Sequence, residues 1–400
     1  MMNKRLPRAQ SPAYYDIAIV GGGPAGLTMA AALLPLGYRI ALIERTPFPA
    51  HLTPAFDGRT TAIAWQGYNL LATIGIWPAL EKLSSPIEKI RIVDRHTPHV
   101  LNFDHAELGH GPFGYIIENR FLRGELLKKL RASKQVTFYN PATVTALDTS
   151  GSVARLTLDS GEISAALVIG ADGKQSPIRQ LLGIDTFGFR YDEQAIICTI
   201  EGDVPHNQVA LEHFLPDGPF AVLPMTENRA SIVWSMKPAM AAAIMALNDN
   251  DFLEAIGRAG AHYMGNIRLI SDRFTYPLSL SHARRYAANH VVLLGEAAHA
   301  IHPIAGQGFN LGLRDIECLR DLIAAAKARG LRADDSSVID NFERQRRRDN
   351  QRMIGATDLL DRLFGFDASW LNRSRQRALS AINRTGPLRR FFMKQAMGYR

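Results

Sequence analysis

Three glycines and one carboxylate near the start of the chain have the spacing that holds a dinucleotide. Gly21, Gly23 and Gly26 follow a short apolar run and open a helix-like segment. The first glycine permits a tight turn, the second lets backbone approach a pyrophosphate, and the third lets the helix pack closely on the strand. Glu44 lies 18 residues after Gly26, where a carboxylate can accept ribose hydroxyls. Residues 16–44 therefore predict a dinucleotide-binding βαβ unit.

Two later segments place a glycine beside a carboxylate after an apolar strand. These are Asp172-Gly173 and Gly295-Glu296, and the second continues through a Pro- and Gly-rich loop at residues 303–310 into a helix. The N–H groups and positive dipole of a helix start stabilise negative charge on a ligand. Plain capping is the simpler interpretation of such turns, with Ser176 as the capping residue of the first.

In this order the three segments resemble the FAD-dependent aromatic hydroxylases, which are single-component flavin monooxygenases. Residues 302–315, HPIAGQGFNLGLRD, are most similar to the branch that acts in ubiquinone biosynthesis. The resemblance covers about the whole chain. It implies an α/β fold with a GR2-type, Rossmann-like FAD-binding domain, an interleaved antiparallel β-sheet substrate domain and C-terminal helices, as in para-hydroxybenzoate hydroxylase.

The domains are expected to be discontinuous along the chain. The FAD-binding domain is predicted at residues 14–86, 119–184 and 286–340, the substrate domain at 87–118 and 185–285, and a basic helical region at 341–400. Residues 61–75 are expected to be helical. Strands of the substrate sheet are expected at ICTIEG, VALEHFL, FAVLPM and RASIVWSM.

The resemblance also implies the cofactor-binding residues. They are Gly21, Gly23, Ala25, Gly26, Glu44, Arg45, Arg59, Asn119, Asp172, Gly173, Glu296, Pro303, Gly306, Gly308, Phe309 and Asn310. Glu296 departs from the family pattern, which usually has Asp there, and Asn119 stands where relatives outside this branch often carry Arg. Arg59 matches an arginine near the cofactor, although a solvent-exposed arginine at a helix start would look the same.

The implied activity is hydroxylation of the aromatic ring of a polyprenyl phenol in ubiquinone biosynthesis, through a C4a-hydroperoxyflavin. FAD carries that chemistry with O2 as co-substrate, and the electron donor is either NAD(P)H or a partner protein. No residue is identified as the catalytic acid or base. For each of the substrate-pocket candidates named next, packing in the protein core is an alternative role. The substrate-pocket candidates are Pro303, Phe220, Pro224, His213 and Trp234, with Phe214 and Leu223 on the same strands.

Two other classes stay open on the same residues. One is a different FAD enzyme of this fold, such as an isoprenoid reductase, another aromatic hydroxylase or a halogenase. The other is a non-catalytic FAD-bound component of a biosynthetic complex. Halogenases of this fold carry Trp-x-Trp-x-Ile-Pro, and Trp234 has no such neighbours. A non-catalytic member would be expected to have a damaged flavin loop, and residues 303–315 match the family pattern.

Composition excludes several kinds of protein. A chain of 400 residues with 46% apolar side chains can bury the core of a two-domain enzyme. Its two cysteines, Cys198 and Cys318, exclude a disulfide framework and fit a reducing compartment, and no metal-ligand spacing occurs. Residues 17–38 carry no charge, but their glycines and prolines would break a membrane-spanning helix. We expect a cytoplasmic protein, peripheral to the inner membrane, that does not bind nucleic acid.

Positive charge is concentrated in residues 341–400, which hold 14 Arg or Lys and 5 Asp or Glu, while the whole chain has a net charge of +8. Two interpretations fit: solvated helix faces, or a surface that binds anionic lipid or an acidic partner such as another ubiquinone-biosynthesis protein. Residues 387–397 predict a helix with two sides. Leu388, Phe391, Phe392 and Ala396 lie on one side, and Met393 and Met397 lie on the other.

Overall fold

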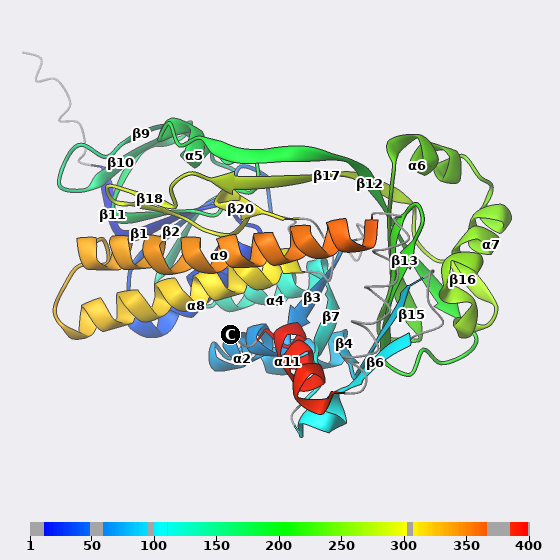
Figure 1. The fold of residues 1–400 in the computed structure, drawn as a ribbon. Helices are drawn as coiled ribbons and strands as arrows, with labels where there is room; N and C mark the ends of the chain where they lie inside the picture. The colour runs from blue at the N-terminus through cyan, green and yellow to red at the C-terminus, as the bar shows by residue number, and fades with distance from the viewer. Residues whose placement is uncertain are drawn as a thin grey trace, which may run out of the picture.

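The computed structural model describes residues 12–48, 59–94, 100–109, 111–301, 307–365 and 385–398. Within these residues the chain forms a cofactor domain and a substrate domain side by side (Figure 1). A long two-stranded ribbon of β12 (Thr186–Gly202) and β17 (Phe274–Ala283) runs from one domain to the other. Because the chain passes between the domains several times, neither domain is one continuous segment.

The cofactor domain is built on an eight-stranded sheet whose central strands are parallel. The order of its main path is β18-β19-β11-β1-β2-β8, and β10 and β9 extend from β11. Its inner strands β2 and β19 are buried along their whole length, as is expected of parallel strands that are covered on both faces. The strands are β1 (Ala13–Val20), β2 (Ile40–Ile43), β8 (Val136–Tyr139), β9 (Val144–Asp148), β10 (Ala154–Leu158), β11 (Gly161–Gly170), β18 (Ala287–Ala288) and β19 (Val291–Leu293).

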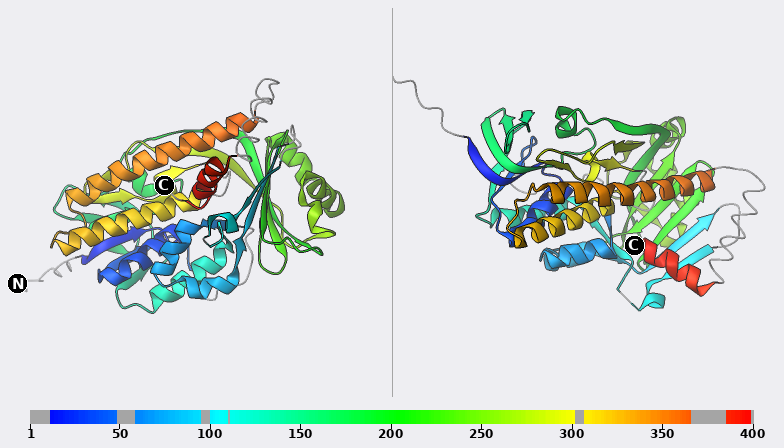
Figure 2. Two further views of the ribbon diagram at one scale, coloured as in Figure 1. Left: turned by 60° about the horizontal axis from the view of Figure 1, so that its bottom comes forward. Right: turned by 60° about the vertical axis from the view of Figure 1, so that its left-hand side comes forward.

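Helices from the start and the end of the chain pack together on this sheet. Helix α1 contacts α4 and α8. Helix α8 lies beside α9, as the views of Figures 1 and 2 agree. All residues of α1 from Gly26 to Leu33 are buried, so this apolar segment forms a core helix. The helices of this domain are α1 (Pro24–Leu33), α4 (Asn119–Arg131), α5 (Pro177–Leu181), α8 (Gln307–Ala328) and α9 (Ser336–Gly365).

The substrate domain is a nine-stranded, mostly antiparallel sheet with helices on one face. The order of its main path is β20-β17-β12-β15-β14-β13-β5-β6, and β16 pairs with β12. Helices α6 (Pro238–Met245) and α7 (Asp249–Ala259) lie beyond this sheet, on the side away from the cofactor domain (Figure 1). The remaining strands are β5 (Lys89–Asp94), β6 (Val100–Asp104), β13 (Val209–Leu215), β14 (Gly218–Pro224), β15 (Arg229–Met236), β16 (Ile267–Leu269) and β20 (His299–Ala300).

A three-stranded sheet joins the two domains and corrects one prediction. Residues 61–75 are not helical throughout, because β3 (Thr60–Ala64) precedes α2 (Trp65–Thr73). The β-branched residues Thr60, Thr61 and Ile63 favour the strand that the prediction missed. Strand β7 (Gly114–Glu118) pairs with both β3 and β4 (Ser84–Ile87), and the short α3 (Trp77–Leu80) follows α2. Of residues 87–118, β5 and β6 therefore lie in the substrate sheet and β7 lies in this joining sheet.

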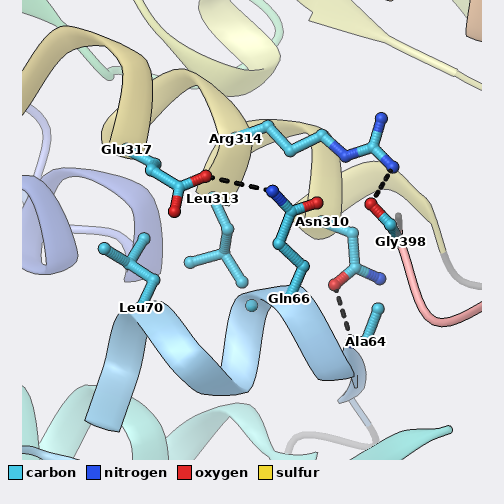
Figure 3. Close-up of a pocket in the computed structure, with 9 residues that line it drawn as sticks. Ala64, Gln66, Leu70, Asn310, Leu313, Arg314, Glu317 and Gly398 are labelled. Atoms are coloured by element: carbon cyan, nitrogen blue, oxygen red, sulfur yellow. Dashed lines mark hydrogen bonds between the residues drawn. The ribbon is translucent and has the colours of Figure 1, made fainter. Parts of the chain in front are cut away.

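The C-terminal helix α11 (Gly386–Ala396) buries its methionine side. Met393 and Met397 are fully buried in a cluster with Leu101 and Phe103 of β6, whereas Phe391 is 55% exposed. The chain then enters a small pocket between α2 and α8, where Arg314 donates to the Gly398 carbonyl at 2.8 Å (Figure 3). Among the described residues, no helix has the length and apolar character needed to cross a membrane.

Candidate cofactor and substrate site

The three motif turns follow neighbouring parallel strands and meet at one edge of the cofactor sheet. The main-chain ties are Gly21 N–H to the Ile43 carbonyl at 2.8 Å, Ala171 N–H to the Val20 carbonyl at 2.8 Å, and Leu294 N–H to the Gly170 carbonyl at 2.9 Å. Strands β2, β1, β11 and β19 thus bring their carboxyl ends together. In open α/β sheets this edge is where ligands bind.

The glycine-rich turn has the shape that a pyrophosphate requires. Gly21 has φ of +117°, and a Cβ there would lie 2.2 Å from the Ala171 carbonyl oxygen. A Cβ on Gly26 would lie 1.9 Å from the Gly21 carbonyl oxygen, whereas a Cβ on Gly23 would meet nothing within 4 Å. No side chain caps α1, which begins at Pro24. The N-terminal N–H groups of α1, including that of Ala25, therefore face open space at the motif, which fits an anionic ligand.

Glu44 lies at the end of β2, as the motif predicts. Its carboxylate accepts from the Gly22 N–H at 2.5 Å and the Thr46 N–H at 2.7 Å. A carboxylate has about four acceptor positions, so two remain for ribose hydroxyls. Arg45 is exposed beside it. The contact of either residue with a nucleotide stays a proposal that this geometry supports.

Asp172 offers a buried oxygen with no partner. Its Oδ2 accepts from the Ile178 N–H at 2.9 Å, but its buried Oδ1 has no hydrogen-bond partner. Burial raises the pKa of this carboxyl above its usual value. Gly173, at φ of +84°, leaves open space where its Cβ would be. A hydroxyl donor of a bound FAD would satisfy Oδ1, so this turn fits the group.

The capping role expected of Ser176 is confirmed, and Arg179 has a role that sequence reasoning missed. The Ser176 hydroxyl accepts from the Arg179 N–H at 3.0 Å, with Pro177 opening α5. The buried Arg179 guanidinium donates to the Ala297 carbonyl at 2.7 Å and the Lys174 carbonyl at 2.9 Å. This side chain therefore joins the second motif turn to the third.

Glu296 is exposed on the turn that Arg179 holds. No hydrogen bond to its carboxylate is found among the described residues, and the preceding Gly295 has φ of +60° and lies close to Ala25. The main chain of this turn is held by Asp315, because the Gly295 N–H donates to Asp315 Oδ2 at 3.0 Å. The longer Glu side chain at this position is therefore available to a ligand. Its contact with the ribityl chain of FAD stays a proposal.

Asp315 anchors a buried ionic network beneath this turn, which the sequence did not reveal. Its carboxylate bonds His299 Nε2 at 2.6 Å and Arg346 Nε at 2.7 Å, and all three side chains are almost completely buried. Burial opposes ionisation of Asp315, but His299 and Arg346 outweigh it and hold the carboxyl pKa at about 2. Arg346 also bonds Asp349 and Asn350 within α9. The network ties the third motif to α8 and α9.

The first turn of α8 places Gly308, Phe309 and Asn310 where the chain enters the helix. The amide of Asn310 bonds the main chain of β3: its Oδ1 accepts from the Ala64 N–H and its Nδ2 donates to the Ala62 carbonyl, both at 2.9 Å. Asn310 holds α8 against β3 and lines the pocket of Figure 3. Its contact with a cofactor stays a proposal. A Cβ on Gly308 would meet nothing within 4 Å. Pro303 and Gly306 lie outside the described residues.

Arg59 and Asn119 are neighbours at the joining sheet. The Arg59 carbonyl accepts from the Asn119 N–H at 3.1 Å, and the Thr61 hydroxyl donates to the Asn119 amide oxygen. Arg59 is exposed. Asn119 thus ties the start of α4 to β3, and a cofactor contact by either residue stays a proposal.

The pocket candidates on the substrate sheet lie on the face that packs against α6 and α7. His213 Nδ1 donates to the Ala259 carbonyl of α7 at 2.7 Å, and Phe220 stacks edge-on against Trp234 within the cluster that includes Phe252. Pro224 pairs with Ala230 of the same cluster. These four side chains therefore pack in the core of the substrate domain, which was the alternative interpretation of the sequence.

The opposite face of the same strands is turned toward the cofactor domain. Ser231 marks it, because its hydroxyl accepts from the Thr60 hydroxyl of β3 at 3.1 Å. Cross-strand pairing places Leu223 beside Ser231, and Phe214 shares the face with Glu212. Successive side chains of a strand point to opposite faces. The residues that face the cofactor domain are therefore the sequence neighbours of the predicted pocket residues His213, Phe220, Pro224 and Trp234. Of the candidates, Phe214 and Leu223 lie on the cofactor-facing side.

Comparison with known proteins identifies the group to which this arrangement belongs. The family model described as "FAD binding domain" matches residues 14–357. The chain is 40% identical to ubiquinone hydroxylase UbiL of Rhodospirillum rubrum over 96% of this chain and 89% of that protein. It is 34% identical to 3-demethoxyubiquinol 3-hydroxylase of Escherichia coli over 96% and 98%.

A solved structure gives the fold independently. The p-nitrophenol 4-monooxygenase PnpA from Pseudomonas putida matches with a TM-score of 0.80 at 16% identity, over 98% of this chain and all of that one. The fold is therefore that of the para-hydroxybenzoate-hydroxylase-like flavin monooxygenases. The residues around the motif turns fit FAD, and among the described residues no group of His, Cys, Asp and Glu could hold a metal ion. The chain belongs to the FAD-dependent ubiquinone-biosynthesis hydroxylases and is an FAD-dependent monooxygenase.

Proposed function

We propose that this enzyme hydroxylates the aromatic ring of a polyprenyl phenol on the route to ubiquinone, in the manner of a 2-polyprenyl-6-methoxyphenol hydroxylase. The observation that carries the proposal is the identity of 34–40% to two ubiquinone-pathway hydroxylases over nearly their whole lengths. The match spans both domains, so it includes the surfaces that would select substrate as well as those that would hold FAD.

In this proposal the chain's own residues bind and orient. Gly21, Gly23 and the start of α1 hold the pyrophosphate, Glu44 the ribose, and Asp172 and Glu296 the remaining hydroxyls of the cofactor. Bound FAD supplies the activation of O2. The cofactor-facing side of the substrate sheet supplies an apolar wall, with Leu223 and Phe214, that excludes water from the reacting ring.

The test is a reconstituted reaction with a short-chain prenyl phenol, FAD, O2 and either NADH or NADPH. We expect a product heavier by one oxygen atom, with reductant consumed in proportion. Reduction of a double bond in the prenyl chain would instead indicate a reductase. Flavin reduction that requires a second protein from the same cells would identify a partner as the electron donor.

A companion experiment uses a strain that lacks its own ubiquinone-pathway hydroxylase. We expect the chain to restore ubiquinone and to remove one accumulated phenolic intermediate, whose mass reports the ring position that is hydroxylated. Unchanged intermediates, together with no product in the reconstituted reaction, would exclude the proposed substrate class.

We also propose that α11 attaches the enzyme to an anionic membrane surface, where a polyprenyl substrate resides. Phe391 and Phe392 are 55% and 37% exposed, and Arg390 and Lys394 are exposed on the same helix. Exposed aromatic rings beside basic side chains suit the lipid interface. Arg389 is excluded from this surface because it bonds Glu107 and the Asn102 carbonyl, and Arg384 lies outside the described residues.

Vesicle sedimentation tests this attachment. Changing Phe391 and Phe392 to Ser together with Arg390 and Lys394 to Gln should reduce binding to vesicles rich in anionic lipid, while turnover of a short soluble phenol persists. The matched control changes Lys237 and Arg258 to Gln, which are exposed in the substrate domain. Equal binding by both variants and the parent at low salt would refute the role of α11.

A further inference from the structure

Glu212 of β13 is a carboxyl on the sheet face that is turned toward the cofactor domain. It pairs across the sheet with Ala221 of β14 and Ile92 of β5, and Ala210 and Phe214 flank it on the same face of its own strand. These four neighbours are apolar. Strand pairing shows which face this is. Ala221, opposite Glu212, lies on the same face of β14 as Leu223, and Leu223 pairs with Ser231, whose hydroxyl bonds Thr60 of β3. Glu212 therefore stands in an otherwise apolar part of the sheet face that is turned toward the joining sheet and the cofactor domain.

The carboxyl has no counter-charge in that part of the sheet face. Glu212 is half-buried, and no hydrogen bond or ion pair to it is found among the described residues. Burial alone raises its pKa to about 7. The other charged groups on this face include Asp94, Arg229, Glu201 and Arg268, as strand pairing places them. Each is engaged elsewhere: Arg229 bonds Glu118 at 2.9 Å, Arg268 bonds Glu201 at 2.5 Å, and Asp94 has a bonding partner of its own.

An isolated carboxyl on an apolar surface lowers the stability of the fold. Such groups persist where a ligand supplies the missing partner, and strongly shifted acids cluster at functional sites. The substrate class proposed above carries a hydrogen-bond donor, the ring hydroxyl, on an otherwise apolar molecule. One polar group in an apolar wall matches one hydroxyl on an apolar substrate.

We propose that the Glu212 carboxylate accepts the hydrogen bond of the substrate's ring hydroxyl and takes its proton as the ring is hydroxylated. The inference rests on the proposed function. The phenolic O–H bond breaks, the proton passes to the carboxylate, and the electron pair stays on the phenolic oxygen. That oxygen then donates electron density to the ring, which makes the ring a better nucleophile toward activated oxygen. The carboxyl later releases its proton to water.

The experiment compares the parent with Glu212→Gln, Glu212→Leu and the control Glu254→Gln. Glu254 is an exposed glutamate of α7 that pairs only with Arg258 among the described residues. The binding readout is the change that a short prenyl phenol causes in the visible spectrum of the oxidised, FAD-loaded enzyme, and it needs no turnover. A phenol whose hydroxyl is methylated serves as the second probe, because it lacks the proton.

We expect all variants to retain FAD. Glu212→Gln should bind the phenol about 10- to 100-fold more weakly, as a hydrogen bond to a charged group is lost, and should bind the methylated probe as the parent does. In the parent, kcat/KM should fall as pH decreases through about 7, because the carboxylate form is required. That acid limb should disappear in Glu212→Gln and persist in Glu254→Gln.

Thermal stability separates this role from a structural one. Glu212→Leu should melt no lower than the parent while losing affinity for the phenol, because it removes an unpaired carboxyl from an apolar wall. Parent-like phenol affinity and an unchanged acid limb in Glu212→Gln would overturn the inference and leave the proposed function intact. A parent enzyme that binds the phenol through Glu212 but never hydroxylates it would overturn the proposed function instead.

Discussion

Gly23 and Gly26 of the first turn differ in what an added side chain would contact. This difference distinguishes a glycine that the fold requires from one that only cofactor binding requires. A Cβ on Gly26 would collide with the Gly21 main chain at 1.9 Å, but a Cβ on Gly23 would enter open space. Gly26 is therefore required for the strand and helix to pack. Gly23 is required only when a ligand fills that space.

This contrast gives a paired prediction. Gly23→Val should fold with parent-like stability and lose FAD, because its side chain would occupy the pyrophosphate position. Gly26→Ala should lower the free energy of unfolding by about 1–3 kcal/mol even without FAD, since main chain must shift. Urea unfolding of the apoprotein and the visible absorbance of the purified protein measure the two effects. A Gly23→Val protein that remains fully loaded with FAD would refute the βαβ assignment.

Glu296 allows a second residue-level test, because it is exposed and available. Glu296→Ala should weaken FAD by about 1.5–3 kcal/mol if its carboxylate binds the ribityl chain, and Glu296→Gln should weaken it less. The control is Glu162→Ala, an exposed glutamate at the start of β11. FAD titration of the apoprotein gives the affinities. Parent-like affinity in Glu296→Ala would show that the Asp of the family pattern has no counterpart here.

At the scale of elements, the network under the third turn makes stability depend on pH. His282 accepts from the Tyr286 hydroxyl at 3.0 Å within this buried region. Burial, with the charges of His299 and Arg347, lowers the His282 pKa to about 4. The unfolded chain binds the proton near pH 6.5, so His282 contributes stability above that pH that is lost as the pH falls toward 4.

We therefore expect the free energy of unfolding to decrease from about pH 6.5 to 4 and the decrease to be smaller in His282→Asn. Part of the decrease should remain, because the pKa of His206 is also lowered by burial. Asp315, with its pKa of about 2, should add a further loss only below its unfolded value near pH 4. Urea denaturation across this range is the measurement, and identical pH profiles for parent and variant would contradict the assignment to His282.

The positions of the substrate-domain strands were predicted correctly, but the sheet face on which each side chain lies was not. VALEHFL and RASIVWSM coincide with β13 and β15, because turn residues bound each apolar run. The face was not predictable, since α6 and α7 cover one side and the cofactor domain the other, and a sheet covered on both sides loses its alternation of apolar and polar residues. A prediction of pocket residues from such strands can therefore be displaced by one position.

The same limit applies to the cofactor site. The glycine turns were predictable because their spacing is local. Arg179 was not, because its partner carbonyl at Ala297 lies 118 residues further along the chain. Glu212 was missed because nothing in VALEHFL distinguishes a carboxyl on the face turned toward the cofactor domain from one that faces solvent.

At the scale of the whole molecule, the interleaved chain should unfold as one unit. The β12–β17 ribbon, the Glu118–Arg229 pair and the Thr60–Ser231 bond all connect the two domains. We expect a single calorimetric transition whose midpoint rises with added FAD, because the ligand binds only the folded state. Two resolved transitions, with only one responding to FAD, would show that the domains unfold separately.

Because β1 lies in the middle of its sheet, its two edges can form strand pairs only at different times during translation. β2 can pair with one edge of β1 almost at once, but the other edge must wait for β11, which begins at Gly161. At about 5–20 residues per second, a ribosome needs roughly 7–30 s to supply it. During that interval the nascent chain exposes an unpaired apolar strand edge, the kind that recruits other chains. Chaperone demand should therefore be greatest in the first half of translation, well before the last FAD-binding turn exists.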